Sequence, residues 1–135
     1  MTLQLSVAVR NAMLDAIETA VGASAILKMR SGSAPANCAA ADSGDVIATL
    51  ALPADWMGPA ANGSKALLGT WQDTAADAAG TVGHFRIYAV DGTTCHFQGT
   101  VTATGGGGDL TLDNIVVAID EPITITGFTL TAPNA

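Results

Sequence analysis

Charged residues are scarce in this chain of 135 amino acids: Asp, Glu, Lys and Arg together make up 13%, where roughly 25% is usual. Bases are the scarcest, since five Lys and Arg stand against twelve Asp and Glu, which gives a net charge of −7. Only one base, Arg86, follows residue 67. Without clustered bases, neither nucleic acid nor an anionic membrane surface is an expected partner. The acidity is equally consistent with a role in solubility, whereas a charge-poor surface is easily desolvated and favours protein contacts.

Long apolar runs and a leader pattern are also missing. No apolar run approaches the ~18 residues that span a bilayer, and residues 1–6 lack the basic and apolar regions of a signal peptide, so neither is expected. There are two cysteines, Cys38 and Cys95. One pair is not a disulfide framework. The two either form one disulfide or, in a reducing cytosol, stay as buried thiols, and the sequence leaves both possibilities open.

What is present predicts one globular domain, residues 1–135, because 49% of the residues are hydrophobic and the length suffices for one core. A helix is expected over about 6–22, where Ser6 can cap the start and Gly22 can end it. Apolar residues recur at helical spacing at Leu14, Ile17 and Val21, with Met13 and Ala20 beside them. Asp15 and Glu18 fall on the other side of the helix, opposite the apolar stripe.

After this helix the hydrophobic pattern alternates with a period of two, which predicts strands. The expected strands lie at 25–30, 46–52, 66–71, in a hairpin over 84–101, and at 110–112, 115–119 and 123–130. About eight short strands over residues 24–131, separated by loops rich in Gly and Pro, are typical of an antiparallel β-sandwich. The predicted fold class is therefore mostly β: a single-domain, jelly-roll-like sandwich preceded by one helix.

The hairpin carries the clearest signal, because Asp91-Gly92 is a strong turn dipeptide. A three-residue loop, residues 91–93, places Ile87 opposite Phe97 and Ala89 opposite Cys95 on one apolar face. A five-residue loop keeps the same faces, whereas a shift by one residue would mix polar and apolar side chains on both. We therefore expect an apolar face that joins the core.

The other face of the hairpin is a possible recognition face. It pairs Tyr88 with His96 and Arg86 with Gln98, and its full set is His84, Arg86, Tyr88, His96 and Gln98. These residues fit contact with a glycan or a protein neighbour. The alternatives are an ordinary solvated strand face and a face packed under a loop. Two histidines without a third ligand at suitable spacing do not predict a metal site.

The remaining candidates point away from catalysis. Trp56 and Trp71 flank the loop 53–65 and are possible residues for stacking on a sugar or for an interface, although a core role explains them as well. The glycine run 105–108 is followed by Asp109 and a strand pattern, and not by the Lys and helix of a phosphate-binding loop. No Gly-x-Ser-x-Gly elbow occurs. We expect no catalytic residue, no cofactor and no metal.

Three stretches resemble a group of small virion structural proteins of tailed bacteriophages, mostly without a described function. They are Leu5–Gly32 (LSVAVRNAMLDAIETAVGASAILKMRSG), Gly69–Tyr88 (GTWQDTAADAAGTVGHFRIY) and Gly92–Asn114 (GTTCHFQGTVTATGGGGDLTLDN), which together run through most of the chain. The group offers no catalytic motif to carry over.

This resemblance implies a place in a phage particle, assembled in the cytoplasm of the host bacterium. The first role that it implies is that of a head decoration or cement protein, which stabilises the capsid as a homo-oligomer in contact with the major capsid protein. The alternative is a tail or fibre-associated module that recognises a host-surface glycan through Trp56, Trp71 or the Tyr88 face. In either role the expected partners are other virion proteins or a host surface, and the protein is not an enzyme.

Overall fold

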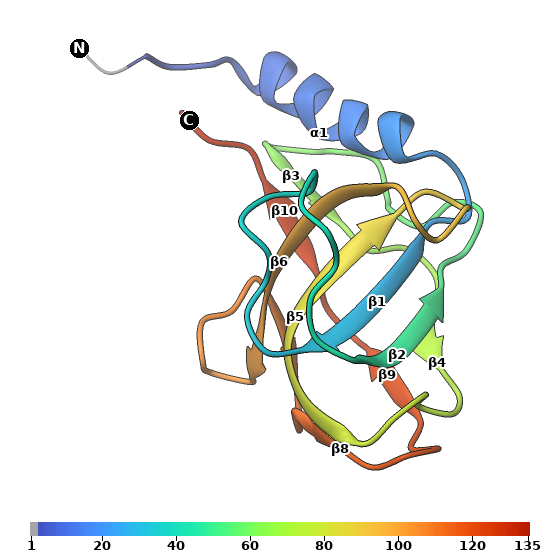
Figure 1. Cartoon of the computed structure of the whole chain (residues 1–135). Coiled ribbons are helices and arrows are strands. Elements are labelled where there is room, and N and C mark those ends of the chain that lie inside the picture. The colour runs from blue at the N-terminus through green and yellow to red at the C-terminus, as the bar shows by residue number, and fades with distance from the viewer. Residues whose placement is uncertain (1–2) are drawn as a thin grey trace.

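The computed structural model describes residues 3–135 as a mostly β domain with one N-terminal helix (Figure 1). The helix α1 spans Val7–Val21. The strands are β1 Ile26–Ser31, β2 Val46–Ala51, β3 Ser64–Ala66, β4 Trp71–Asp73, β5 Gly80–Tyr88, β6 Cys95–Ala103, β7 Leu110–Leu112, β8 Val116–Val117, β9 Ile123–Ile125 and β10 Thr129–Thr131.

The main sheet is curled and has the strand order β2-β1-β5-β6-β7, with β8 paired to the start of β5 (Figure 1). Two short antiparallel ladders, β3 with β10 and β4 with β9, stand apart from it. All the pairs are antiparallel except β6 and β7, which run parallel. Parallel neighbours usually need a crossover of about a dozen residues or more, yet only the short turn 104–109 joins these two.

An aromatic cluster joins the main sheet to the ladders. Phe85 and Phe97 project from neighbouring strands of the sheet, with ring centroids 6.3 Å apart and an edge-on arrangement. Phe128 lies just before β10, 5.7 Å from Phe85 and 5.6 Å from Trp71 of β4. Edge-to-face pairs at such separations are favourable. The core therefore sits between the sheet and the two ladders.

The ends of α1 follow the sequence signals. The Ser6 side chain accepts a hydrogen bond from the backbone N–H of Val9 at 3.2 Å, and Gly22 adopts a φ of 91°, a conformation that favours glycine. Ser6 and Gly22 thus flank the helix on either side.

Two expected strands are each split into two. The segment 66–71 divides because Ala66 pairs with β10 while Trp71 pairs with β9. The segment 123–130 divides in the same way, since Ile125 pairs with β4 and Thr129 with β3. Each chain segment crosses from one ladder to the other, and the crossing interrupts the strand. The expected strand 115–119 is also shorter, with only Val116–Val117 paired.

The hairpin register is confirmed where it matters for the core and differs near the turn. Ile87 pairs with Phe97 and Arg86 with Gln98, as expected. The register then shifts, so that Tyr88 pairs with Cys95. The expected pairs Tyr88–His96 and Ala89–Cys95 are wrong, because His96 is an extra residue in a β-bulge. Cys95 consequently lies on the polar side of the sheet and not in the apolar core.

Candidate functional site

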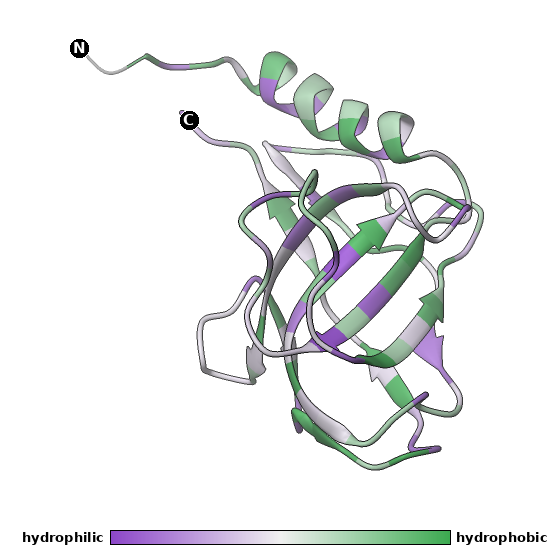
Figure 2. Cartoon of the chain, viewed as in Figure 1, coloured by the Kyte–Doolittle hydropathy of each residue, from purple (hydrophilic) through white to green (hydrophobic). Residues whose placement is uncertain are grey.

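The face proposed for recognition is mostly an internal one. His84, Arg86 and Tyr88 are at most 1% exposed. They lie beneath the loop between β1 and β2 (residues 32–45), which contributes hydrogen-bond partners to all three. Figure 2 shows hydrophilic segments within β1 and β5, in the middle of the main sheet. We call this the polar face; its residues are Lys28, Arg30, His84, Arg86, Tyr88 and Gln98. The alternative of a face packed under a loop describes it, and no free recognition surface is formed there.

Asp42 of the loop is the hub of the polar face. Its carboxylate accepts hydrogen bonds from Tyr88 Oη at 2.7 Å and from Arg30 Nη2 at 3.0 Å, and it also pairs with Arg86. Burial alone would raise the pKa of Asp42. The hydrogen bond from Tyr88 and the two guanidinium charges outweigh burial, and they hold the pKa of Asp42 below its ordinary value. Asp42 is therefore the charge partner of two buried arginines.

Arg86 organises the backbone of the loop. Its guanidinium donates to the carbonyl oxygens of Cys38 at 3.0 Å and of Ala40 at 3.3 Å. Gln98 Nε2 donates to the carbonyl of Pro35 at 2.7 Å, further along the same loop. The guanidinium has several donors in a fixed geometry and can hold several carbonyls at once. The loop is thus fastened to the sheet by side chains that reach its main chain.

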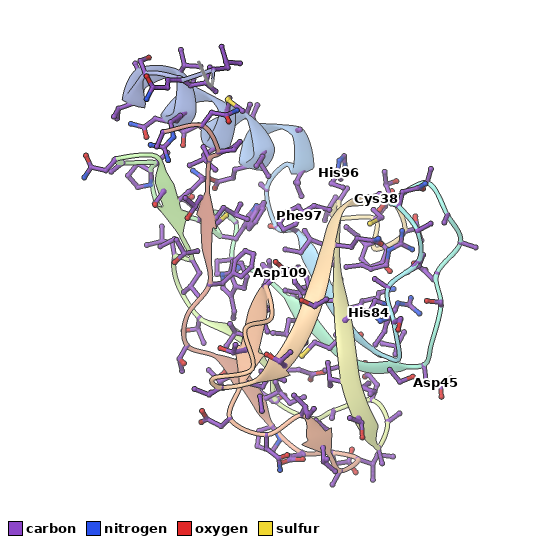
Figure 3. All side chains as sticks on the ribbon, turned by 90° about the vertical axis from the view of Figure 1, so that its left-hand side faces the viewer. Cys38, Asp45, His84, His96, Phe97 and Asp109 are labelled. Atoms are coloured by element: carbon purple, nitrogen blue, oxygen red, sulfur yellow. The ribbon has the colours of Figure 1, made fainter. Side chains whose placement is uncertain are left out.

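His84 and His96 lie at different levels of the β5–β6 pair, because His84 pairs with Thr100 while His96 lies in the bulge next to Cys95. His84 is fully buried, and its Nδ1 lies 2.8 Å from the carbonyl oxygen of Gly32, the first residue of the loop. His96 is exposed at the other end of β6, far from His84 (Figure 3). The two histidines therefore share no site.

The two cysteines, by contrast, meet. Cys38 of the loop and Cys95 at the start of β6 place their Sγ atoms 3.1 Å apart. Both are free thiols and both are half-buried. Burial, followed by the hydrogen bond with Cys38, raises the pKa of Cys95 to about 11, while Arg86 acts in the opposite direction. The bulge produces this contact, since it turns Cys95 toward the loop.

Trp56 and Trp71 belong to the core. Neither is exposed. Their ring centroids are 6.0 Å apart, and both indole N–H groups are used internally, Trp56 Nε1 with the carbonyl of Gly22 at 2.9 Å and Trp71 Nε1 with the carbonyl of Trp56 at 3.0 Å. Buried rings with satisfied polar atoms present no face to a sugar.

The glycine run serves the tight β6–β7 connection. Asp109, at its end, accepts hydrogen bonds from the backbone N–H of Thr100 at 2.9 Å and from Thr100 Oγ1 at 3.0 Å. A Cβ on Gly106 or Gly108 would lie within 3.0 Å of the Thr102 side chain. Glycine is therefore required by close packing in a turn, and the carboxylate is occupied within the chain.

Helix α1 is attached to the domain by polar side chains as well as by the buried Leu14 and Val21. The Arg10 guanidinium donates to the carbonyl of Ala132 at 2.7 Å, and Asn11 Oδ1 accepts from the backbone N–H of Gly63 at 2.8 Å. The buried Lys65 of β3 makes ion pairs of 2.8 Å with both Asp15 and Glu18. Asp15 and Glu18 thus contact the body of the protein.

A second apolar side of the helix is left uncovered. It follows the spacing i, i+4, i+7, i+11 and consists of Val9, Met13, Ala16 and Ala20, which we call the helix stripe. Val9 is 46% exposed and Met13 42%. Beside the stripe a groove of about 430 Å³ runs between α1 and β6, lined on the sheet side by His96 and Phe97.

Sequence reasoning placed Met13 and Ala20 beside the core-facing stripe and missed this surface. The signal was in the sequence nevertheless, because apolar residues occupy more of the helix circumference than one buried face requires.

Within residues 3–135, His, Cys, Asp and Glu side chains form no group of three that could hold a metal ion. No helix in that part of the chain is long and apolar enough to cross a membrane. Comparisons of the chain with models of protein families, with curated proteins and with solved structures give no match.

Proposed function

We propose that this chain is a structural protein of a bacteriophage virion, a head decoration or cement protein that works as a homo-oligomer in contact with the major capsid protein. It acts by burying surface at repeated contacts, and not by chemistry. The observation that carries the proposal is the helix stripe, an exposed apolar surface on the only helix within residues 3–135. The resemblance of three long stretches to virion structural proteins supplies the biological setting.

The charge distribution supports self-association at the stripe. Copies with a net charge of −7 repel one another over most of their surface. The helix stripe carries no acid, because Asp15 and Glu18 are held on the opposite side by Lys65. Two copies can therefore approach there without juxtaposing carboxylates. Burial of apolar area contributes about 25 cal/mol per Å². Leu3 and Val7, near the N-terminus, are further exposed apolar residues outside the stripe.

The alternative of a tail or fibre module that binds a glycan finds less support. Stacking on a sugar ring needs an exposed aromatic face. Trp56, Trp71 and Tyr88, which were the candidates, are all fully buried.

We propose further that the fold belongs to the β-sandwich class, in a jelly-roll-like variant. Its support is the layering, in which the main sheet packs across the aromatic cluster onto the β3–β10 and β4–β9 ladders. An experimental structure of the oligomer tests this fold assignment, because it will show whether β3 pairs with β10 and β4 with β9.

The oligomer is tested by light scattering of the purified protein after size-exclusion chromatography. We expect a defined oligomer for the natural sequence and a monomer for Met13→Gln with Ala20→Gln, which places two polar side chains on the stripe. The control, Ala8→Gln, alters an exposed position on another side of α1 and should keep the oligomer. Glutamine is a good helix former, so both variants should retain helical circular dichroism.

The virion assignment is tested on particles of the phage that encodes the chain. Mass spectrometry of washed virions should detect it, and purified protein should bind empty heads. A strictly monomeric protein that is absent from washed virions contradicts the proposal. Localisation to tail fibres would favour the alternative.

A further inference from the structure

Cys38 and Cys95 are brought together by two features that do not depend on their sulfur atoms. Arg86 and Gln98 hold the β1–β2 loop by the carbonyls of Pro35, Cys38 and Ala40, and this places Cys38 over the start of β6. The bulge at His96 directs Cys95 to the same side. The Sγ atoms are 3.1 Å apart, about 1 Å more than the length of a disulfide bond.

We propose that Cys38 and Cys95 form an intramolecular disulfide that locks the β1–β2 loop onto the polar face when the protein leaves a reducing compartment. The timing rests on the proposed function, because a virion protein is made in the host cytoplasm and then released from it. The bond itself rests only on the geometry of the chain. Both thiols are half-buried, so a small oxidant can reach them.

The chemistry is thiol–disulfide exchange with a low-molecular-weight disulfide such as oxidised glutathione. The thiolate of Cys38 attacks one glutathione sulfur, forms a mixed disulfide and releases one glutathione thiolate. Cys95 then loses its proton and attacks Cys38 Sγ, which releases the second. The two protein thiols lose two electrons and two protons, and the glutathione disulfide is reduced to two thiols. Arg86 lies beside Cys95 and favours its thiolate in the second step.

The lock would act on a loop that is held to the sheet by contacts between residues far apart in sequence. The loop holds the buried charges of the polar face through Asp42. A disulfide between Cys38 and Cys95 ties this loop to the hairpin directly and removes conformational freedom from the unfolded chain. The oxidised protein should therefore keep its loop closed under conditions that weaken the ion pairs of Asp42.

The experiment compares purified protein incubated with reduced and with oxidised glutathione. With oxidised glutathione we expect both free thiols to disappear, the intact mass to fall by two hydrogens with no glutathione attached, and Tm to rise by about 10 °C. Peptide mapping should join Cys38 to Cys95 within one chain. The loop should also become more resistant to a protease of broad specificity.

The single variants provide the decisive contrast. Cys38→Ser and Cys95→Ser each lack the second thiol, so each should stop at a stable glutathione adduct and gain no Tm. If the natural chain also ends as a doubly glutathionylated protein, or as a disulfide-linked dimer, the proposal is wrong. This result is obtained with the purified chain alone. Absence of the protein from virions would therefore contradict the proposed function without affecting the disulfide proposal.

Discussion

The polar face under the β1–β2 loop and the helix stripe differ both in polarity and in exposure to solvent. The polar face carries charged side chains, yet Arg86 is 1% exposed. The helix stripe carries only apolar side chains, yet Met13 is 42% exposed. The polar face has partners within the chain, since Asp42 and loop carbonyls accept hydrogen bonds from its arginines. Within residues 3–135, three of its buried polar atoms have no partner, namely His84 Nε2, Arg86 Nε and Gln98 Oε1. The stripe has no such cover among the described residues.

In this protein, the burial of a side chain depends more on the hydrogen-bond and charge partners available to it than on whether it is polar or apolar. A buried guanidinium is tolerated when its hydrogen bonds and its charge are both matched. An exposed apolar stripe persists because the polar contacts of Arg10 and Lys65 already attach the helix. The two surfaces should therefore respond differently to substitution: the polar face in stability, the stripe in association.

The largest expected effect comes from displacing the loop. A Cβ at Gly83 would lie 2.2 Å from the carbonyl oxygen of Gly32, a backbone atom that cannot turn away. We expect Gly83→Ala to lower the free energy of unfolding by about 3 kcal/mol and to increase hydrogen exchange in the loop. Gly127→Ala is the control, since nothing lies within 4 Å of its Cβ position. Equal urea midpoints for the two variants would contradict the close approach of loop and sheet.

Removal of the hub should have the next largest effect. Asp42→Ala leaves the buried Arg86 without its charge partner and the Tyr88 hydroxyl without its acceptor. Loss of one partner from a buried pair costs more than loss of an exposed one, but the Asp42 side chain is 38% exposed, so solvent moderates the loss to about 2 kcal/mol. Asp45→Ala is the control in the same loop, where the carboxylate points outward (Figure 3). If urea unfolding shows the same loss of stability for both variants, the assignment of Asp42 as the hub is wrong.

The smallest effect is a dependence on pH. The pKa of Asp42 is lowered in the folded protein, so its contribution is present above the unfolded pKa of about 3.9. That contribution is lost as the pH falls through the folded value. The stability difference between the natural chain and Asp42→Asn should therefore be full at neutral pH and shrink as the pH falls below about 3.9. A difference that stays constant over this range would show that the ion pairs contribute nothing. Asp91, whose pKa is about 2, is common to both proteins and cancels.

Local signals in the sequence located α1 and the core register of the hairpin. Ser6 and Gly22 act on adjacent backbone, and the alternation around Ile87 and Phe97 determines which face is apolar. The bulge at His96 was not predictable, because a strand with one extra residue shows no distinctive residue type at that position. A face packed under a loop was one of the alternatives, but the residues that cover it were not predictable, since Asp42 and Arg86 are 44 residues apart in sequence and nothing local indicates that they meet.

The contact between Arg10 and Ala132 has a consequence for the order of events during synthesis. These residues are 122 positions apart, and β3 in the same region pairs with β10 at the other end of the chain. Translation at about 5–20 residues per second therefore leaves α1 without its docking site for roughly 10 s. The nascent helix lacks the contacts that bury Leu14 throughout that interval, and the helix stripe stays uncovered as well. The domain is consequently complete only after β10 has been made, and the chain is most exposed to chaperones and to premature association before that point.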